Sequence, residues 1–345
     1  MKKYLSYIFA AAAVLSFAAC SDDDDQEVSY GKLNLAGEGA YVINEGNYSG
    51  KVNGTIDWIS TSGDSVVNGV FASANGFSAG GTLNDGLIDD DILYVTATDE
   101  NLVWMVNANT AEVVGKVTVY QPRCLVESDD NVYVTSYNGR VYEISEKQRK
   151  LTDSTEVIGD LLEGIAERNG YLYVCNSCDA AYSPHTNVIK LKRDGLEKVK
   201  DITVGSNPNI IVNTSDGIYV NTWGNYSDES SDVQQIDDDD QVTSLGIQAS
   251  VMAVGNGKLY LANTDYSSFE MTYLTYDLTT KETAQFIEAP MNGLPYQIAV
   301  DSETGDVLVG LTNWTNPGFV FRYSSDGELL HEYGVGLNPG TIVVR

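Results

Sequence analysis

Histidine is almost absent from this chain, which has only His185 and His331 among its 345 residues. Two histidines so far apart in the sequence predict neither a paired-histidine metal site nor a Ser-His-Asp triad. Basic residues are also few, because 20 lysines and arginines stand against 49 acidic residues, a formal net charge of −29. Such an acidic surface repels phosphate backbones, so we expect no nucleic acid partner.

The sequence also lacks the residue spacing of a calcium-binding EF-hand loop. The aspartate runs at residues 89–91 and 237–240 fall on expected turns, and neither has the ligand pattern of an EF-hand. We interpret both runs as solvated charge. No catalytic motif remains, and the chain is predicted not to be an enzyme.

Long apolar segments are lacking too. The stretch from Tyr4 to Phe17 is too short to span a bilayer, follows two lysines and ends in small residues before Cys20. We therefore predict a signal peptide over residues 1–19. The segment before Cys20 resembles a bacterial lipobox, which implies that Cys20 is lipidated and anchors the chain in a membrane. A signal peptide without lipidation, cleaved nearby, is the alternative.

Four aspartates follow the anchor. Ser21 and residues 22–25 resemble the export signal of Bacteroidota surface lipoproteins, which implies an outer-membrane protein facing the cell exterior. By its chemistry alone, the run predicts an extended, self-repelling acidic tether, which we assign to residues 20–39.

Proline is scarce, whereas glycine and tyrosine are abundant, with 7, 32 and 22 residues respectively. This composition favours a turn-rich all-β fold. An alternating strand of the form "LYVTAT" recurs seven times, with equivalent positions at Tyr41, Tyr94, Tyr133, Tyr173, Tyr219, Tyr260 and Leu308. The spacings of 53, 39, 40, 46, 41 and 48 residues suit four short strands per repeat.

Seven such repeats predict a seven-bladed β-propeller over residues 40–345. The first repeat lacks an inner strand, and the C-terminal "NPGTIVVR" matches the inner strand of "NPNIIVN". We therefore expect residues 341–345 to pair with residues 41–44 and close the ring. A linear β-solenoid would leave this last strand without a partner.

Three cysteines remain besides the anchor: Cys124, Cys175 and Cys178. In an oxidising compartment they predict one disulfide, either local or between blades, with Cys124 as a possible partner for either of the other two. His185 is expected in a solvated loop, and its alternative role is an axial metal ligand of a bound cofactor.

Long loops rich in aromatic and amide side chains are expected on one rim of the propeller. Flat apolar faces beside amide groups suit a sizeable polar organic ligand. Packing between blades is the alternative for each aromatic residue. The candidate ligand-binding residues are Asn47, Tyr48, Tyr137, Asn138, Tyr182, Trp223, Asn225, Tyr226, Tyr266, Tyr296 and Trp314.

The segments "YVINEGNYSGKVNGTIDWIS" and "VVNGVFASANG" resemble the opening of YncE-like lipoprotein propellers of the Bacteroidota. Within that family the resemblance extends to the cobalamin-binding BtuG type. It implies a surface protein that captures cobalamin or a related corrinoid for an outer-membrane TonB-dependent transporter, with the corrinoid as ligand and no resident cofactor. A propeller that binds a glycan or a protein is the alternative, and an enzyme such as a lactonase comes third.

Overall fold

The structure is a computed structural model that describes residues 33–290 and 293–345. The predicted signal peptide, Cys20 and the aspartate run that follows it lie outside the described residues. The compact unit begins at Leu33, ahead of the expected boundary at residue 40. Leu35 is buried against the propeller, and its amide donates a hydrogen bond of 2.9 Å to the carbonyl oxygen of Asn109. In the described part of the chain, no helix is long and apolar enough to cross a membrane.

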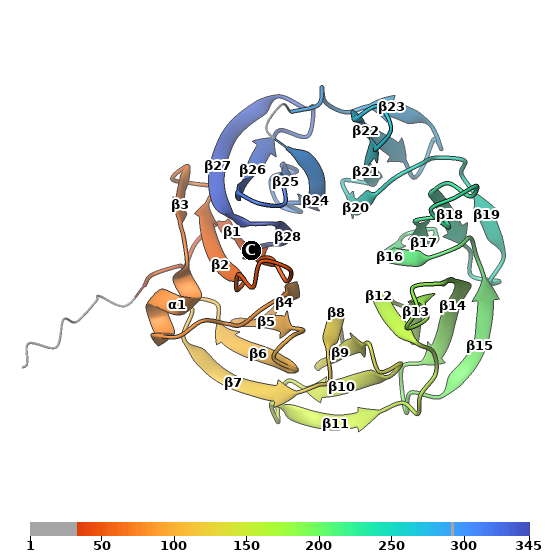
Figure 1. Ribbon diagram of the computed structural model, residues 1–345, viewed down its shortest axis with the longest axis horizontal. Helices are drawn as coiled ribbons and strands as arrows, with labels where there is room; N and C mark the ends of the chain where they lie inside the picture. The colour runs from red at the N-terminus through yellow and green to blue at the C-terminus, as the bar shows by residue number, and fades with distance from the viewer. Residues whose placement is uncertain (1–32, 291–292) are drawn as a thin grey trace, which may run out of the picture. The chain divides into compact units, whose positions relative to one another are not determined.

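The described strands form seven antiparallel sheets of four strands each, arranged in a ring (Figure 1). The fold is therefore the expected all-β, seven-bladed propeller. One short helix, α1 (Val70–Asn75), follows the first sheet.

The blades are numbered in chain order, and the strands of each blade are given from the innermost strand outward. Blade 1 contains β28 (Pro339–Val344), β1 (Gly39–Asn44), β2 (Thr55–Ser60) and β3 (Ser65–Val67). Blade 2 contains β4 (Leu83–Asp89), β5 (Ile92–Ala97), β6 (Leu102–Asn107) and β7 (Val113–Thr118). Blade 3 contains β8 (Pro122–Ser128), β9 (Asn131–Ser136), β10 (Val141–Ser145) and β11 (Lys150–Ser154).

The remaining blades repeat this order. Blade 4 contains β12 (Leu161–Arg168), β13 (Tyr171–Cys178), β14 (Pro184–Lys192) and β15 (Lys198–Thr203). Blade 5 contains β16 (Pro208–Thr214), β17 (Gly217–Thr222), β18 (Asp232–Ile236) and β19 (Val242–Ser244). Blade 6 contains β20 (Val251–Gly255), β21 (Lys258–Asp265), β22 (Glu270–Asp277) and β23 (Thr283–Gln285). Blade 7 contains β24 (Leu294–Val300), β25 (Val307–Thr312), β26 (Pro317–Tyr323) and β27 (Leu329–Leu337).

The two ends of the described chain close the ring in blade 1. Strand β28 pairs antiparallel with β1, so that Tyr41 lies opposite Val343 and Ala40 lies opposite Val344. This pairing confirms the predicted closure. It gives β1 a hydrogen-bonded neighbour on its inner side and completes blade 1 with four strands, as in the other blades.

The repeated tyrosines of the second strands form the core between blades. Six of the seven equivalent positions are tyrosines, and each of these side chains is at most 3% exposed. The hydroxyl of Tyr41 donates a hydrogen bond of 2.8 Å to the carbonyl oxygen of Ala108 in the next blade. A buried tyrosine supplies a large apolar ring and a hydroxyl that needs a partner, so it fixes one blade against its neighbour.

Candidate functional site

A central cavity of about 1000 Å³ runs along the inner strands of all seven blades. Five of the predicted site residues contribute to its wall: Trp223, Tyr226, Tyr266, Tyr296 and Trp314. All five belong to blades 5 to 7, and four of them lie in or beside the loops at the predicted rim. These rim aromatics therefore lie on one side of the cavity opening.

Irregular strand pairing aims side chains into this cavity. In six of the seven blades the inner strand has a bulge near the rim end, with one more residue than the partner strand has at that point, and β20 is regular. In blade 4 an extra residue of β13, Ser177, compensates this bulge. Such a β-bulge bends the strand and redirects its side chains. The bulge positions are Asn84 and Asp85, Arg123 and Cys124, Glu163 and Gly164, Asn209, Tyr296, and Gly340.

Arg123 and Glu163 form an ion pair in the cavity wall between blades 3 and 4. The guanidinium donates through Nε to Oε2 at 3.0 Å and through Nη2 to Oε1 at 3.2 Å, and the Tyr137 hydroxyl also donates to this carboxylate. The guanidinium lies 4.5 Å from the centre of the Tyr137 ring. Burial lowers the pKa of Arg123, but the charge of Glu163, its hydrogen bond and the charges of Tyr137 and Cys124 together outweigh burial, so the pKa is raised overall. The guanidinium of Arg123, the basic group of the cavity, is therefore paired with a carboxylate of the protein itself.

Two further carboxyl groups line the cavity nearby. Glu45, directly after β1, accepts a hydrogen bond of 2.7 Å from the Tyr296 hydroxyl. Asp85 accepts from the backbone amides of Leu125 and Gly86, each at 2.8 Å. Burial raises the pKa of both, to about 6 for Asp85, although these hydrogen bonds and the charge of Arg123 act in the opposite direction.

The aromatic side of the opening is held in place by polar contacts. The Trp314 ring meets the Tyr296 ring edge to face at 5.3 Å between centroids, and the Asn47 amide donates to the Trp314 carbonyl oxygen at 3.0 Å. The Tyr226 hydroxyl accepts a hydrogen bond of 2.8 Å from the Asn207 amide. These contacts orient the rings before any ligand arrives.

Other predicted site residues lie outside this cavity. Asn47 and Tyr48 line a smaller pocket of about 400 Å³ beside blade 1, and Tyr48 is 78% exposed. Tyr182 is 74% exposed on its loop and lines neither pocket. Asn225 accepts hydrogen bonds from three backbone amides of its own loop, so it shapes that loop.

Two more predicted residues do not line the cavity, and one of them, Tyr137, contacts its wall. Tyr137 holds Glu163 and covers Arg123, as described above, without lining the cavity itself. The Asn138 amide donates to the Tyr142 hydroxyl at 2.7 Å. Both residues lie at the start of the loop after β9.

Four charged residues of the cavity were missed from the sequence: Glu45, Asp85, Arg123 and Glu163. Three of them lie near the start of inner strands, in "LNDGLID", "PRCLVES" and "LLEGIAER". A charged residue shortly after the start of each inner strand was the available signal.

The expected disulfide is not formed, because Cys124, Cys175 and Cys178 are all free thiols. Cys175 and Cys178 lie on the same strand, β13, with a β-bulge between them at Ser177. Burial raises the pKa of Cys124, and the charges of Asp85 and Glu163 add to the effect, so its thiol stays protonated at neutral pH.

The expectation that His185 lies in a loop was also wrong. The residue belongs to β14, and its Nε2 lies 2.7 Å from Oδ2 of Asp160. It does not line the cavity.

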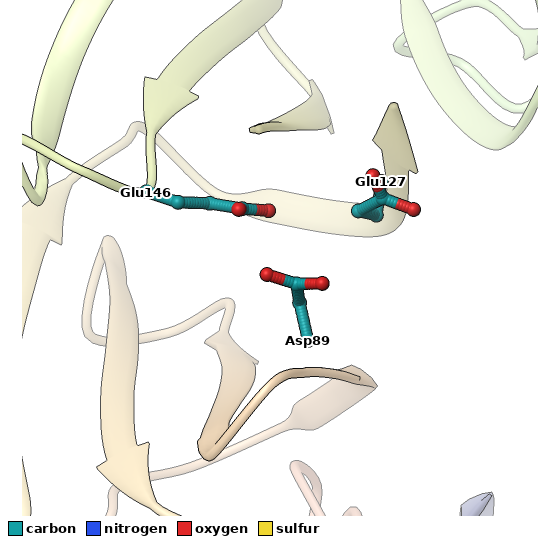
Figure 2. Close-up of side chains that lie close together, drawn as sticks. All are labelled: Asp89, Glu127 and Glu146. Carbon is teal, nitrogen blue, oxygen red and sulfur yellow. The ribbon is translucent and has the colours of Figure 1, made fainter. Parts of the chain in front are cut away.

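A separate acidic cluster lies at the far ends of blades 2 and 3, formed by Asp89, Glu127 and Glu146 (Figure 2). One carboxylate oxygen from each residue lies within 4.8 Å of the others, a spacing at which the three could hold a metal ion. Burial, a hydrogen bond with Asp89 and the charges of Asp89 and Glu127 raise the pKa of Glu146 to about 8. Without a cation, the cluster therefore retains a proton.

No protein-family model and no curated protein match this sequence. Solved structures do match it. A quinonprotein alcohol dehydrogenase-like protein from Bacteroides thetaiotaomicron superposes with a TM-score of 0.68 and 16% identity, over 90% of this chain and 79% of that chain. Hydrazine synthase of Kuenenia stuttgartiensis superposes with a TM-score of 0.60 and 15% identity, over 74% of this chain and 86% of that chain. Apo AztD from Citrobacter koseri superposes with a TM-score of 0.58 and 11% identity, over 89% of this chain and 97% of that chain.

At these identities the similarity shows the fold alone. The chain is a seven-bladed β-propeller with a central cavity, an architecture consistent with a non-catalytic binding protein. Its assignment to the YncE-like family stays a prediction.

Proposed function

We propose that this protein is a lipid-anchored capture protein of the cell surface, whose central cavity binds cobalamin or a related corrinoid for an outer-membrane TonB-dependent transporter. The observation that carries the proposal is the cavity itself, with five aromatic side chains in its wall. Ligand pockets typically measure about 300 to 1000 Å³, so this cavity suits a large ligand. A corrinoid is a large ring with an amide fringe, which suits both the aromatic wall and the polar groups opposite.

Binding without conversion is supported by the state of the reactive groups. Arg123, Glu163 and Tyr137 are engaged with one another, and the raised pKa of Cys124 disfavours a nucleophilic thiolate. Neither histidine lines the cavity. These features favour recognition over acid-base or covalent catalysis.

A glycan- or protein-binding role is the second candidate. It is favoured by the aromatic side chains that stay exposed outside the cavity, of which Tyr48, Tyr182 and Phe269 are each at least 65% exposed. Exposed aromatic rings on a rim suit the stacking of sugars or a protein contact. The cavity favours the corrinoid, because a flat platform would need no enclosed volume.

Calorimetric titration of the purified chain with cyanocobalamin tests the proposal. We expect one site per chain, and Trp223→Ala should weaken binding by about 1 to 3 kcal/mol, as for a buried interface anchor. Tyr182→Ala is the control, because its side chain is exposed away from the cavity, and it should bind like the wild type. Absence of binding at micromolar cyanocobalamin would reject the corrinoid and favour the second candidate.

A further inference from the structure

The wall of the central cavity has two chemically different sectors. The charged sector belongs to blades 1 to 4 and contains Glu45, Asp85, Arg123 and Glu163. The apolar sector belongs to blades 5 to 7, and its inner strands contribute Ile210, Val212, Met252, Val254, Ile298 and Val300. In Figure 1 the strands of the charged sector, β4, β8 and β12, face those of the apolar sector, β16, β20 and β24, across the central space.

Charge in the first sector is unbalanced. It contains three carboxyl groups and one guanidinium, and that guanidinium is held by Glu163 through two hydrogen bonds. Glu45 and Asp85 form no ion pair with any described residue. The sector therefore attracts positive charge and repels negative charge, and its partly buried position limits screening by salt.

Glu45 is the carboxyl group best placed to meet a ligand. Both oxygens of Asp85 already accept backbone hydrogen bonds, and both oxygens of Glu163 accept from Arg123. In Glu45, Oε2 accepts from the Tyr296 hydroxyl, whereas Oε1 has no hydrogen-bond donor among the described residues. Glu45 also lies beside Tyr296 and Trp314, which line the aromatic side of the opening.

We propose that the cavity recognises a ligand with a flat apolar body and a nitrogen N–H group, which donates to the free oxygen of Glu45 while the body packs against blades 5 to 7. A cationic nitrogen binds more tightly than a neutral one, and an anion at the same position is rejected. This inference rests on the proposed function in assigning the ligand to the same cavity. It names the chemical group by which that ligand is selected and oriented.

Two dyes of the same shape and opposite charge test this selection. Acridine with an amino substituent is a cation at neutral pH, and acridine with a carboxylate at the same ring carbon is an anion. Each is titrated into the purified chain in about 0.15 M NaCl, where charges on the open surface are largely screened, and bound dye is measured by fluorescence. We expect the cation to bind at least tenfold more tightly than the anion.

Glu45→Gln is the decisive variant, because its amide oxygen still accepts the hydrogen bond from Tyr296 and the fold is retained. It should reduce the preference for the cation at least fivefold. Asp326→Asn is the matched control, since it removes one negative charge from an exposed turn outside the cavity. It should leave the preference unchanged, and circular dichroism confirms that both variants are folded.

Equal affinity for the two dyes, no binding of either dye, or the same loss in Asp326→Asn as in Glu45→Gln would each overturn the inference. Cyanocobalamin is titrated into the same proteins to separate this result from the proposed function. Binding of cyanocobalamin without discrimination between the dyes would overturn the inference alone. Discrimination between the dyes without binding of cyanocobalamin would support the inference and reject the corrinoid.

Discussion

Glu45 and Tyr296 lie 251 positions apart in the sequence, yet the Tyr296 hydroxyl donates a hydrogen bond of 2.7 Å to the Glu45 carboxylate in the cavity wall. Glu45 follows β1, the second strand of blade 1, and Tyr296 is the bulge residue in the inner strand of blade 7. The bond thus crosses the junction where the ring closes. Two residues of the cavity wall are therefore joined across the contact between the first and last blades.

Tyr296→Phe removes this bond and leaves the Glu45 carboxylate without a donor among the described residues. We expect a loss of about 1 to 3 kcal/mol in unfolding free energy at pH 8, the cost of an unpaired buried group. The pKa of Glu45 already exceeds its ordinary value of 4.5, and the substitution raises it further. Above the folded wild-type pKa of Glu45, the folded variant therefore binds more protons than the folded wild type, so its stability falls further and its deficit grows as pH rises.

Urea denaturation at pH 5 and pH 8 measures this difference. Tyr266→Phe is the control, because Tyr266 lines the same cavity and its hydroxyl makes no hydrogen bond to a described residue. A deficit of equal size at both pH values would show that the carboxylate is not involved.

Deletion of residues 339–345 removes β28, the inner strand of blade 1. This exposes the edge of β1 and the apolar side chains that β28 buries, so we expect a loss of more than about 4 kcal/mol. Thermal unfolding followed by circular dichroism measures the effect. Arg345→Ala, which leaves β28 intact, should cost far less, and a truncated chain as stable as the wild type would contradict closure by this strand.

Glu146→Gln relieves charge repulsion in the acidic cluster with Asp89 and Glu127 (Figure 2). The pKa of Glu146 rises from 4.5 to about 8 on folding. The folded wild type therefore holds more protons in this range, and its stability falls as pH rises from 4.5 to 8. The variant lacks this loss and should be about 1 kcal/mol more stable at pH 8, since solvent screening reduces the full effect.

Chemical denaturation across this pH range, without divalent cations, measures the difference. Asp326→Asn provides a control for the change in net charge. A variant that is less stable than the wild type at pH 8 would show that the carboxylate contributes favourably, as it would if the cluster held a cation.

Cys20→Ala should release the chain from membranes, because the substitution removes the residue predicted to carry the lipid. Membrane fractionation followed by immunoblotting compares the variant with the wild type. Ser21→Ala is the control and should stay with the membrane fraction. A variant without Cys20 that remains as firmly bound as the wild type would contradict the lipoprotein prediction.

The sequence predicted the blades well because each blade repeats one strongly patterned strand. Tyr41 and its equivalents mark the second strand of six blades, and their burial between sheets follows from the alternation of apolar and polar residues. The role of the C-terminal strand followed from counting strands. Strand alternation is a local property, so one chain suffices to detect it.

The cavity could be predicted only in part. The aromatic residues Trp223, Tyr266 and Trp314 line the cavity because they lie just after second strands, and their contact with a ligand stays a prediction. Arg123 and Glu163 were missed, because their direction depends on β-bulges that break the alternation of the inner strands. Asn225 has amide chemistry suited to a ligand, but hydrogen bonds within its own loop occupy the side-chain oxygen.

Asn209→Trp tests most directly whether the ligand occupies the central cavity. Asn209 is the bulge residue of β16 and lines the cavity, so a large ring at this position fills the space that the ligand needs. Lys147→Trp places the same ring on an exposed turn outside the cavity. In calorimetric titrations with cyanocobalamin, we predict that the wild type and Lys147→Trp bind one ligand with equal affinity, whereas Asn209→Trp binds at least a hundredfold more weakly. Unchanged binding by a folded Asn209→Trp protein would contradict the account.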